Sequence, residues 1–334
     1  MQNITFVDIF SGAGGLALGI ESAGFRNLAT LEIDKYAVQT LKKNRPNWNV
    51  INEDIKNITS KSDVEIKEIF HAEDLDLFTG GAPCQSFSYA GKTLGLNDTR
   101  GTLFYHYAKC VSVLRPKIFL FENVKGMLTH DSGKTFSIIK KVLSDTGYKV
   151  QYRVLNAWNY GVAQKRERLI LIGIRNDLNI QYNYPEELSY RPVLKDILPA
   201  PESAGMAYSK DKEAIIKLVP MGGNWKSIDQ KIAKDYMKGS YDSQGGKTGY
   251  LKRLDLNSPS PTILTSPCQK QTDRCHPIEN RPLTIRESAR IQSFPDEWEF
   301  IGSLANQYKQ IGNAVPVKLA YYLGLSIKEA LFES

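Results

Sequence analysis

A cysteine on a polar loop and a glutamate at the end of an apolar run are the residues of this sequence best suited to chemistry. The cysteine is Cys84, in the segment GAPCQSFS at 81–88, which directly follows the apolar run LDLFT. The glutamate is Glu122, which follows the apolar run IFLF at 118–121. A thiolate can attack an electron-poor ring while a nearby carboxyl group assists as an acid. An inert buried cysteine is the alternative for a lone thiol, and the polar, proline-led loop argues against it.

The elements that position both residues are expected to be strands of one sheet. Segments typical of strands occur at 4–10, 28–33, 75–79 and 118–124, and segments typical of helices lie between them at 16–22, 35–43 and 102–115. This alternation predicts parallel strands joined by right-handed crossovers. Segments 148–155 and 168–174 are expected to add the last two strands. Ligands of such sheets bind beyond the carboxyl ends of the strands, where Cys84 and Glu122 both lie.

A glycine-rich turn, Ser11-Gly12-Ala13-Gly14-Gly15, follows the first strand and leads into a helix. Glycines allow close approach of the backbone to a ligand, and the start of a helix offers unpaired N–H groups. Glu32 ends the second strand, where a carboxylate can accept hydrogen bonds from ribose hydroxyls. The glycine spacing departs from the dinucleotide motif G-x-G-x-x-G. A nucleoside cofactor without a pyrophosphate is therefore favoured, and a plain tight turn is the alternative.

Composition allows a polyanionic partner and excludes several other classes. The 334 residues include 43 Lys and Arg against 36 Asp and Glu, a net charge of +7. Such a surplus attracts phosphates, although solubility explains it equally well. No run approaches the roughly 20 apolar residues of a membrane span, and no signal peptide is evident, so we expect a cytoplasmic protein. The four cysteines form neither a disulfide framework nor a complete zinc motif, so no metal is expected.

The pattern changes after about residue 180, where prolines crowd a short segment and a polar, glycine-rich stretch follows. Clear periodicity returns only at Leu283. We therefore predict a catalytic and cofactor-binding domain at 1–180 and a smaller domain of loops and short strands at 185–280. A C-terminal segment at 283–334 is expected to pack back on the first domain. Its last helix starts near Pro316 and carries on one face Leu319, Leu323, Ile327 and Ala330.

The motifs, taken in order, resemble those of the cytosine-5 DNA methyltransferases. FSGAGG (10–15) resembles the family's first cofactor motif, GAPCQSFS (81–88) its catalytic loop, and FENV (121–124) its glutamate motif. QKRER (164–168), RESARIQSFP (286–295) and YKQIGNAVP (308–316) resemble the three motifs that follow. The resemblance runs from residue 6 to about residue 330. Two departures, Ala82 in place of a proline and Glu53 in place of a glycine, touch no reacting group.

This resemblance implies a doubly wound, mostly parallel, Rossmann-like α/β sheet that binds S-adenosylmethionine, and a smaller, mainly β and loop domain that recognises double-stranded DNA. It implies that the Cys84 thiolate adds to carbon 6 of a flipped-out cytosine and that Glu122 binds the ring at N3. Arg166 and Arg168 would hold the base oxygen and order the active-site loop, and Asn123 would anchor it. Carbon 5 then takes the methyl group, a base removes the carbon-5 proton, and Cys84 is eliminated. The sequence does not name that base, and water is one candidate.

The resemblance also assigns binding positions. Phe10 would lie against the adenine, Glu32 would take the ribose hydroxyls, and Asp54 would accept from the adenine amino group. The full set implied for the cofactor is Phe10, Ala13, Gly15, Glu32, Ile33, Asp54, Ile55, Pro83, Leu103, Asn313 and Val315. The set implied for DNA is Gln85, Ser88, Arg100, Lys247, Arg253, Thr262, Lys270 and Arg274. The stretch from Gln85 to Arg100 suits a loop that closes over DNA.

Three alternatives stay open at this point: an RNA cytosine methyltransferase, an inactive regulatory relative and an NAD-dependent dehydrogenase. The insert of about 100 residues between the fourth and fifth motifs favours sequence-specific reading of DNA. Intact Cys84 and Glu122 argue against an inactive relative, and the glycine spacing argues against a dehydrogenase. Because a catalytic core and one recognition region account for nearly the whole chain, we expect the modification half of a bacterial restriction system. It would protect host DNA, associated with the nucleoid when acting, from an endonuclease with which it forms no stable complex.

Overall fold

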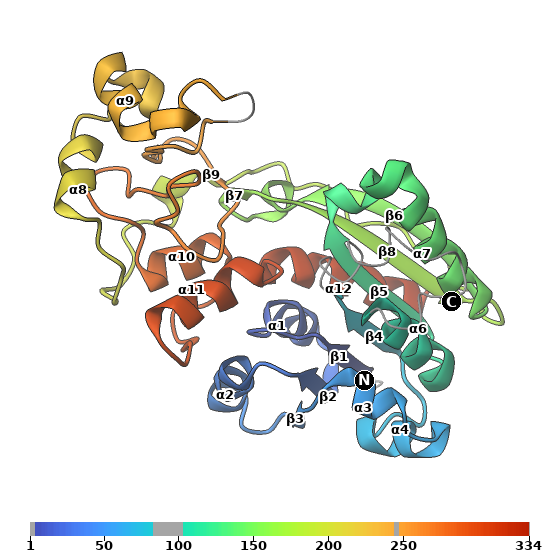
Figure 1. Ribbon diagram of the computed structural model, residues 1–334. Coiled ribbons are helices and arrows are strands. Elements are labelled where there is room, and N and C mark those ends of the chain that lie inside the picture. Colours follow the sequence, from blue (N-terminus) through green and yellow to red (C-terminus); the bar gives the residue numbers. More distant parts are fainter. Residues whose placement is uncertain (1–3, 83–102, 244–246, 334) are drawn as a thin grey trace. The chain divides into compact units, whose positions relative to one another are not determined.

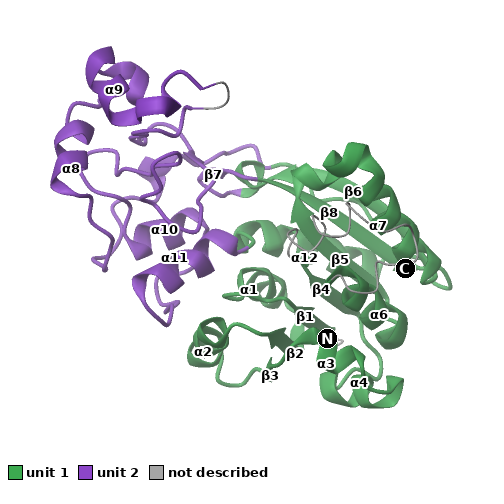
Figure 2. Cartoon of the chain, viewed as in Figure 1, with its two compact units in different colours: residues 1–160, 167–187, 315–334 green, residues 161–166, 188–314 purple. Residues whose placement is uncertain are grey.

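The protein forms two compact units in a computed structural model that describes residues 4–82, 103–243 and 247–333. The larger unit consists of Met1–Tyr160, Glu167–Glu187 and Val315–Ser334, and the smaller unit consists of Gly161–Arg166 and Leu188–Ala314 (Figure 2). The expected boundaries differ from these. The segment from 283 to 314 belongs to the smaller unit, and only the last helix joins the larger one. The helices at 285–291 and 304–313 are bonded within the smaller unit, since the Tyr308 hydroxyl donates to the carbonyl oxygen of Leu283 and the Gln292 amide donates to that of Ile311.

A seven-stranded sheet with the order β3-β2-β1-β4-β5-β8-β6 forms the centre of the larger unit (Figure 1). Its strands are β1 Thr5–Ile9, β2 Arg26–Glu32, β3 Val50–Asn52, β4 Leu77–Gly80, β5 Ile118–Val124, β6 Tyr148–Asn156 and β8 Glu167–Arg175. Strands β1 to β5 pair in parallel, which confirms the expectation from their alternation with helices. Strand β8 lies between β5 and β6 and is antiparallel to both, so the sheet is mostly parallel, as expected. No crossover helix separates β6 from β8, and a short connection suits an antiparallel pair.

Helices cover both faces of this sheet. They are α1 Gly15–Ser22, α2 Lys35–Asn44, α3 Ile55–Thr59, α4 Asp63–Phe70, α6 Leu103–Leu114, α7 Lys134–Asp145 and α12 Val317–Phe332. Side chains of α3, α4, α6 and α7 share one apolar core with alternate residues of the strands. Helices α1 and α12 pack closely, since a Cβ at Gly19 would lie 2.4 Å from the Cβ of Ala320. The predicted apolar face of α12 is confirmed, because Leu319, Leu323, Ile327 and Ala330 are all buried.

The smaller unit contains more helix than we expected. Its helices are α8 Lys210–Ile216, α9 Gln230–Met237, α10 Ile285–Ile291 and α11 Leu304–Asn313, and its strands are the two-residue pair β7 Gln164–Lys165 and β9 Ser260–Pro261. We expected loops and short strands at 185–280, and the described residues there are mainly loops with the short strand β9, to which the structure adds helices α8 and α9. Helix α9 is capped by Asp229, whose carboxylate accepts from two backbone N–H groups at its start. It buries Ala233 and Met237 in a separate apolar core with Trp225.

Single turns of 3-10 helix complete the described structure, at Lys125–Leu128, His130–Gly133, Ala157–Tyr160, Leu194–Asp196, Trp225–Ser227 and Lys238–Ser240. The predicted strands and helices up to Val124 are confirmed, with ends that shift by at most two residues. Within the described ranges, no helix is both long and apolar enough to cross a membrane.

Candidate active site and cofactor pocket

Glu122 forms an ion pair with Arg168 at the carboxyl end of β5. Antiparallel pairing of β5 with β8 places Val124 opposite Arg168 and Glu122 opposite Ile170, so the two charged side chains are diagonal neighbours. Nε of Arg168 lies 2.8 Å from Oε1 of Glu122, and the two side chains are only 11% and 13% exposed. Because both side chains are largely buried, this ion pair fixes the orientation of the Glu122 carboxylate. Two of the predicted catalytic residues are thus brought together.

The chain that leads to Cys84 is fastened to the same strand end. The side-chain amide of Asn123 donates to the carbonyl oxygen of Ala82 at 2.8 Å, as expected for an anchor of that loop. Gly81 passes directly against the glutamate, because a Cβ there would lie 2.7 Å from Oε2 of Glu122. The predicted residues Pro83, Cys84, Gln85, Ser88 and Arg100 lie outside the described residues. The described part of the loop nevertheless starts within contact distance of the Glu122 carboxylate.

Arg166 has a different role from the one we expected. It is 2% exposed, and its guanidinium donates to the carbonyl oxygens of Ile263, Gly312 and Ala314 at 2.8–3.1 Å. A guanidinium withdrawn from water needs such acceptors to offset its desolvation. These contacts join β7, β9 and the end of α11 within the smaller unit. We therefore correct the expectation that Arg166 holds the base oxygen: it braces the backbone.

Glu32 accepts three backbone hydrogen bonds at the end of β2. Its Oε2 accepts from the N–H of Gly12 at 2.7 Å, and its Oε1 accepts from the N–H groups of Ile33 and Asp34 at 2.9 and 2.8 Å. Burial raises the pKa of Glu32, while these three donors oppose the increase. The carboxylate thus ties the glycine turn after β1 to the end of β2. Gly12 and Gly14 in that turn have φ of 53° and 86°, values that favour glycine.

The remaining predicted cofactor residues divide between the pocket edge and the core. Ile33 is 63% exposed beside Glu32, which is unusual for an isoleucine and leaves an apolar surface for a ligand. Phe10 is half-buried, Ala13 and Gly15 are buried in the turn and the first position of α1, and Leu103 is half-buried at the start of α6. Asp54 caps α3 by accepting from the N–H of Lys56, and Ile55 is buried in the core, so it supports the pocket from beneath. Val315 is buried and belongs to the larger unit, whereas Asn313 is exposed and belongs to the smaller unit.

Comparison with known proteins decides the family. The model of the family described as C-5 cytosine-specific DNA methylase matches residues 4–329. The chain belongs to this family. Among its relatives, the methylase is 54% identical over 325 residues to the type II methyltransferase M.Sau96I of Staphylococcus aureus, with 96% of this chain and 74% of that protein covered. It is 50% identical over 338 residues to the type II methyltransferase M.PspPI of Psychrobacter sp. (strain TA137), with 98% and 79% covered.

A solved structure also resembles the methylase over its whole length. It is that of a prophage-encoded E. coli protein assigned as a DNA modification methyltransferase. The TM-score is 0.73 at 25% identity, and the match covers 99% of this chain and 100% of the other. The expected Rossmann-like fold with a mostly parallel sheet is thereby confirmed.

Enzymes of this family methylate carbon 5 of cytosine in DNA with S-adenosylmethionine as the methyl donor, and so does this methylase. The ends of β1, β2 and β3 fit that cofactor. A carboxylate, Glu32, and an exposed apolar side chain, Ile33, lie there side by side, and these are the kinds of group that a ribose and an adenine would contact. Negative charge on Glu32 and Asp54 would attract a sulfonium cation and repel the pyrophosphate of a dinucleotide. Membership of the methylase family thus excludes the alternative of an NAD-dependent dehydrogenase, and the carboxyl groups at the strand ends also disfavour it.

Two arginines that we expected to contact DNA are instead buried in the smaller unit. Arg253 is 4% exposed and donates to five backbone carbonyl oxygens and to the side chain of Asn280. Arg274 is 7% exposed and donates to the carbonyl oxygens of Thr262, Thr272 and Asp273, and burial lowers its pKa to about 10. Both expectations were wrong, because a sequence does not distinguish an arginine that satisfies backbone carbonyls from one that faces solvent.

The lysines and the threonine that we predicted for DNA lie nearer the surface. Lys270 is exposed, with Nζ 4.7 Å from the ring centroid of Tyr236. Lys247 is half-buried, with Nζ 5.9 Å from the ring centroid of Trp225. Thr262 is half-buried, and its hydroxyl donates to the carbonyl oxygen of Lys165. Sequence reasoning missed the exposed lysines on and around α9, which are Lys226, Lys231, Lys234 and Lys238. The interleaving of lysines with aromatic residues between 225 and 241 is the signal that could have indicated them.

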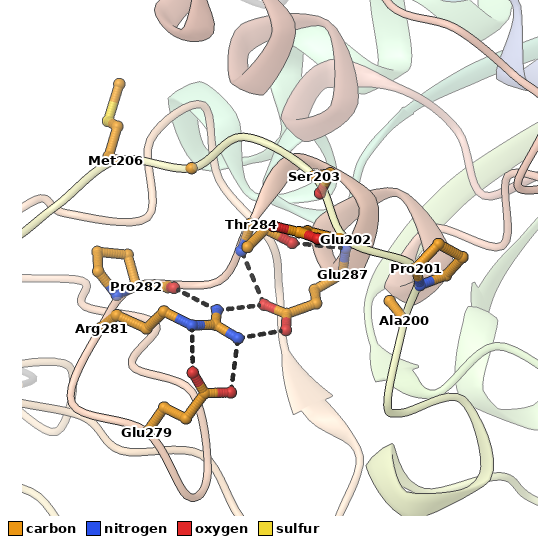
Figure 3. Close-up of a pocket in the computed structure, with 11 residues that line it drawn as sticks. Ala200, Pro201, Glu202, Ser203, Met206, Glu279, Arg281, Pro282, Thr284 and Glu287 are labelled. Carbon is orange, nitrogen blue, oxygen red and sulfur yellow. Dashed lines mark hydrogen bonds and ion pairs between the residues drawn. The ribbon is translucent and has the colours of Figure 1, made fainter.

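A cavity of about 360 Å³ lies in the smaller unit (Figure 3). Its lining includes Glu202, Ser203, Met206, Glu279, Arg281 and Glu287. Arg281 bridges two of these carboxylates, with nitrogen–oxygen distances of 2.8 Å to both Glu279 and Glu287. The polar groups of the wall are therefore largely paired with one another. None of the predicted catalytic or cofactor residues contributes to this wall.

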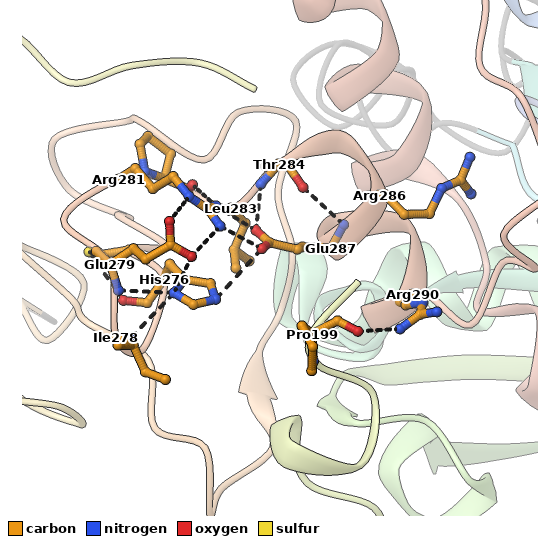
Figure 4. A network of polar contacts seen from close by, with 12 residues as sticks. Pro199, His276, Ile278, Glu279, Arg281, Leu283, Thr284, Arg286, Glu287 and Arg290 are labelled. Carbon is orange, nitrogen blue, oxygen red and sulfur yellow. Dashed lines mark hydrogen bonds and ion pairs between the residues drawn. The ribbon is translucent and has the colours of Figure 1, made fainter. Parts of the chain in front are cut away.

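The motif R-E-x-A-R belongs to the same region and proves to be structural. Glu287 accepts from the N–H of Thr284 at the start of α10 and from both terminal nitrogens of Arg281 (Figure 4). Although burial acts to raise it, the pKa of Glu287 is lowered by the ion pair with Arg281. Arg286 donates to two carbonyl oxygens of the following loop, and Arg290 pairs with Asp296. The motif thus caps α10 and holds the segments around it.

Proposed function

We propose that this enzyme is the modification methyltransferase of a type II restriction system, which methylates one cytosine within a short word of double-stranded DNA. The single observation that carries the mechanism is the Glu122–Arg168 pair, against which the start of the Cys84 loop is fastened. The restriction role is supported by the relatives described as type II methyltransferases, which share about half of their aligned residues with this chain.

In the proposed mechanism, the target cytosine leaves the duplex and its ring meets Cys84 and Glu122. The Cys84 thiolate forms a bond to carbon 6, and the displaced electron pair moves toward N3. Glu122 stabilises the charge that develops at N3, which lowers the barrier to the addition. Arg168 holds Glu122 in position and binds the neighbouring base oxygen. The bound S-adenosylmethionine supplies an electrophilic methyl group on a sulfonium sulfur.

Once carbon 5 carries the methyl group, the ring regains its aromaticity by losing the proton from carbon 5 and the Cys84 thiolate from carbon 6. A base, for which we propose water, takes the proton from carbon 5. The electron pair of that C–H bond re-forms the double bond and expels the Cys84 thiolate. Cofactor binding falls to the larger unit, through the Ser11–Gly14 turn, Glu32, Ile33 and Asp54. We also assign Phe10, Pro83, Leu103 and Val315 of this unit to the pocket, whereas Asn313 belongs to the smaller unit and is implied only by the resemblance.

The smaller unit is proposed to hold the DNA. The exposed Lys270 and the half-buried Lys247 are candidates for phosphate contacts, which attract the duplex without reading its sequence. Thr262 sits in the segment PTILT at 261–265, which we propose approaches the base edges. Gln85, Ser88 and Arg100, which lie outside the described residues, are proposed to contact DNA. The enzyme would act on chromosomal DNA in the cytoplasm and need no stable complex with a partner endonuclease.

Bisulfite sequencing of DNA from cells that express the chain tests this function. We expect one cytosine of one short DNA word to be protected from conversion, and a Cys84→Ser variant to leave that word unmethylated while still binding DNA. Methyl transfer to duplex DNA and to tRNA should be compared with the purified enzyme. Transfer to tRNA alone, or a fully active Cys84→Ser variant, would contradict the proposal.

A further inference from the structure

Asp8 is a fully buried carboxylate in the middle of β1, next to the cofactor turn. Its neighbours Val7 and Ile9 belong to the core shared with α6, so alternation along the strand turns Asp8 toward the other face of the sheet. The hydroxyl of Thr79 donates to its Oδ1 at 2.6 Å. Its Oδ2 has no hydrogen-bond partner among the residues that the structure describes. Negative charge on a buried carboxylate oxygen that accepts no hydrogen bond is energetically unfavourable.

The groups around Asp8 oppose a negative charge on it. Glu32, at the end of the adjacent strand β2, accepts three backbone N–H groups, a set of donors that suits its ionised form. Burial raises the pKa of Tyr107 on α6, so that its phenol stays protonated and carries no charge. The buried faces of α1, α6 and α12 carry no charged side chain. Within the described structure, nothing cationic therefore balances Asp8.

Burial is the main reason that the pKa of Asp8 is raised to about 7; the nearby hydroxyls of Ser11 and Thr79 oppose the increase, and the charge of Glu32 adds a smaller contribution to it. Ser11 also connects Asp8 to the turn, because its hydroxyl donates to the Asp8 carbonyl oxygen. Two carboxyl groups that repel each other titrate as a pair, and one of them keeps a proton more easily than the other. Burial raises the pKa of Glu32 too, but Glu32 accepts three backbone N–H groups, whereas Oδ2 of Asp8 accepts no hydrogen bond from the described residues. We therefore assign the proton of the pair to Asp8.

We propose that Asp8 senses the charge of the cofactor: it holds a proton when no ligand is bound and releases it when a cationic ligand binds beside the Ser11–Gly14 turn. The inference rests on the cofactor site proposed above. The sulfonium of S-adenosylmethionine stabilises the carboxylate that remains, whereas the product S-adenosylhomocysteine is a neutral thioether at that atom and does not. Asp8 would thus make the enzyme favour the methyl donor over the spent cofactor.

Titration calorimetry of the wild-type protein tests this without any reaction. Binding is measured at pH 6 in several buffers that differ in ionisation enthalpy, with three ligands: the sulfonium cofactor, an analogue with an amine in its place, and S-adenosylhomocysteine. We expect both cationic ligands to release close to one proton more than the thioether does. At pH values below the pKa of Asp8, raising the pH by one unit should increase the affinity for the sulfonium cofactor, relative to that for the thioether, roughly tenfold. Above pH 8 the extra release should vanish.

Variants identify the group that releases the proton. Asp8→Asn should bind the cationic ligands without extra proton release and lose most of its preference over the thioether. Asp76→Asn, a matched change at another buried aspartate that pairs with Lys117 just before β4, should keep both properties. Equal proton release with all three ligands, or release that persists in Asp8→Asn, would overturn the proposal. If none of the ligands bound the wild-type protein, the cofactor site itself would be refuted instead. Should Asp8→Asn fail to fold, the ligand series on the wild type decides.

Discussion

Replacing Gly81 with alanine should disable catalysis through a single displaced carboxylate. The added Cβ would lie 2.7 Å from Oε2 of Glu122 and 3.1 Å from its carbonyl oxygen, whereas ordinary contact begins at 3.4 Å. The backbone at Gly81 is outside the left-handed region, so alanine adds no strain of its own there. The Glu122 carboxylate must then move by about 0.7 Å, the difference between 3.4 and 2.7 Å. That shift also pulls on its 2.8 Å contact with Arg168.

A displacement of about 1 Å at a reacting group can reduce a rate by roughly 100-fold. We therefore expect Gly81→Ala to lower kcat by about 10- to 100-fold, equivalent to about 1.4–2.7 kcal/mol of transition-state stabilisation. Single-turnover methyl transfer to a cognate duplex measures this, with cofactor affinity measured separately and expected to stay unchanged. The matched control is Gly126→Ala, where an added Cβ has nothing within 4 Å. Equal activity of the two variants would refute the assignment of Glu122.

Three further predictions concern charge. Arg253→Met should lower the free energy of unfolding by roughly 3–5 kcal/mol in urea denaturation, because it leaves several buried carbonyl oxygens without a hydrogen-bond donor. A stable variant with selectively weakened DNA binding would contradict the structural role. In the ligand-free protein, the folded-state pKa of Asp8 lies above that of the free side chain, so the folded state keeps an extra proton. The free energy of unfolding should fall by at most about 4 kcal/mol as pH rises from about 4 to about 7, and Asp8→Asn should lack this slope. Lys270→Ala and Lys247→Ala should each reduce the slope of log affinity for DNA against log salt by about one, and an unchanged slope would remove that lysine from the DNA interface.

The strand-end residues could be predicted from sequence because their signal is local. Glu32 and Glu122 each follow an apolar run, and the end of a parallel strand is where such a sheet binds ligands. The ion pair between Glu122 and Arg168 could not be derived in this way. It depends on β8 running antiparallel beside β5, and the hydrophobic pattern of a strand does not carry its direction.

The contacts of the arginine side chains could not be predicted from the sequence. Arg166 and Arg168 are two residues apart, which within one strand would place them on the same face. The chain leaves β7 and enters β8 between them, so Arg166 braces carbonyl oxygens of the smaller unit while Arg168 meets Glu122. Arg253 is likewise satisfied by carbonyl oxygens that are distant in sequence. Helix α9 was not predicted because only two of its eight residues, Ala233 and Met237, are buried. Two buried positions make too short an apolar face to be recognised in a sequence.

The central claim is that one sulfur bonds transiently to a cytosine held beside the Glu122–Arg168 pair. A duplex that carries 5-fluorocytosine at the methylated position tests it, because fluorine blocks the final elimination. With S-adenosylmethionine present, we expect a stable protein–DNA adduct whose mass spectrum places the link on the peptide that contains Cys84. Complete absence of such an adduct, or a link at any other residue, would contradict it.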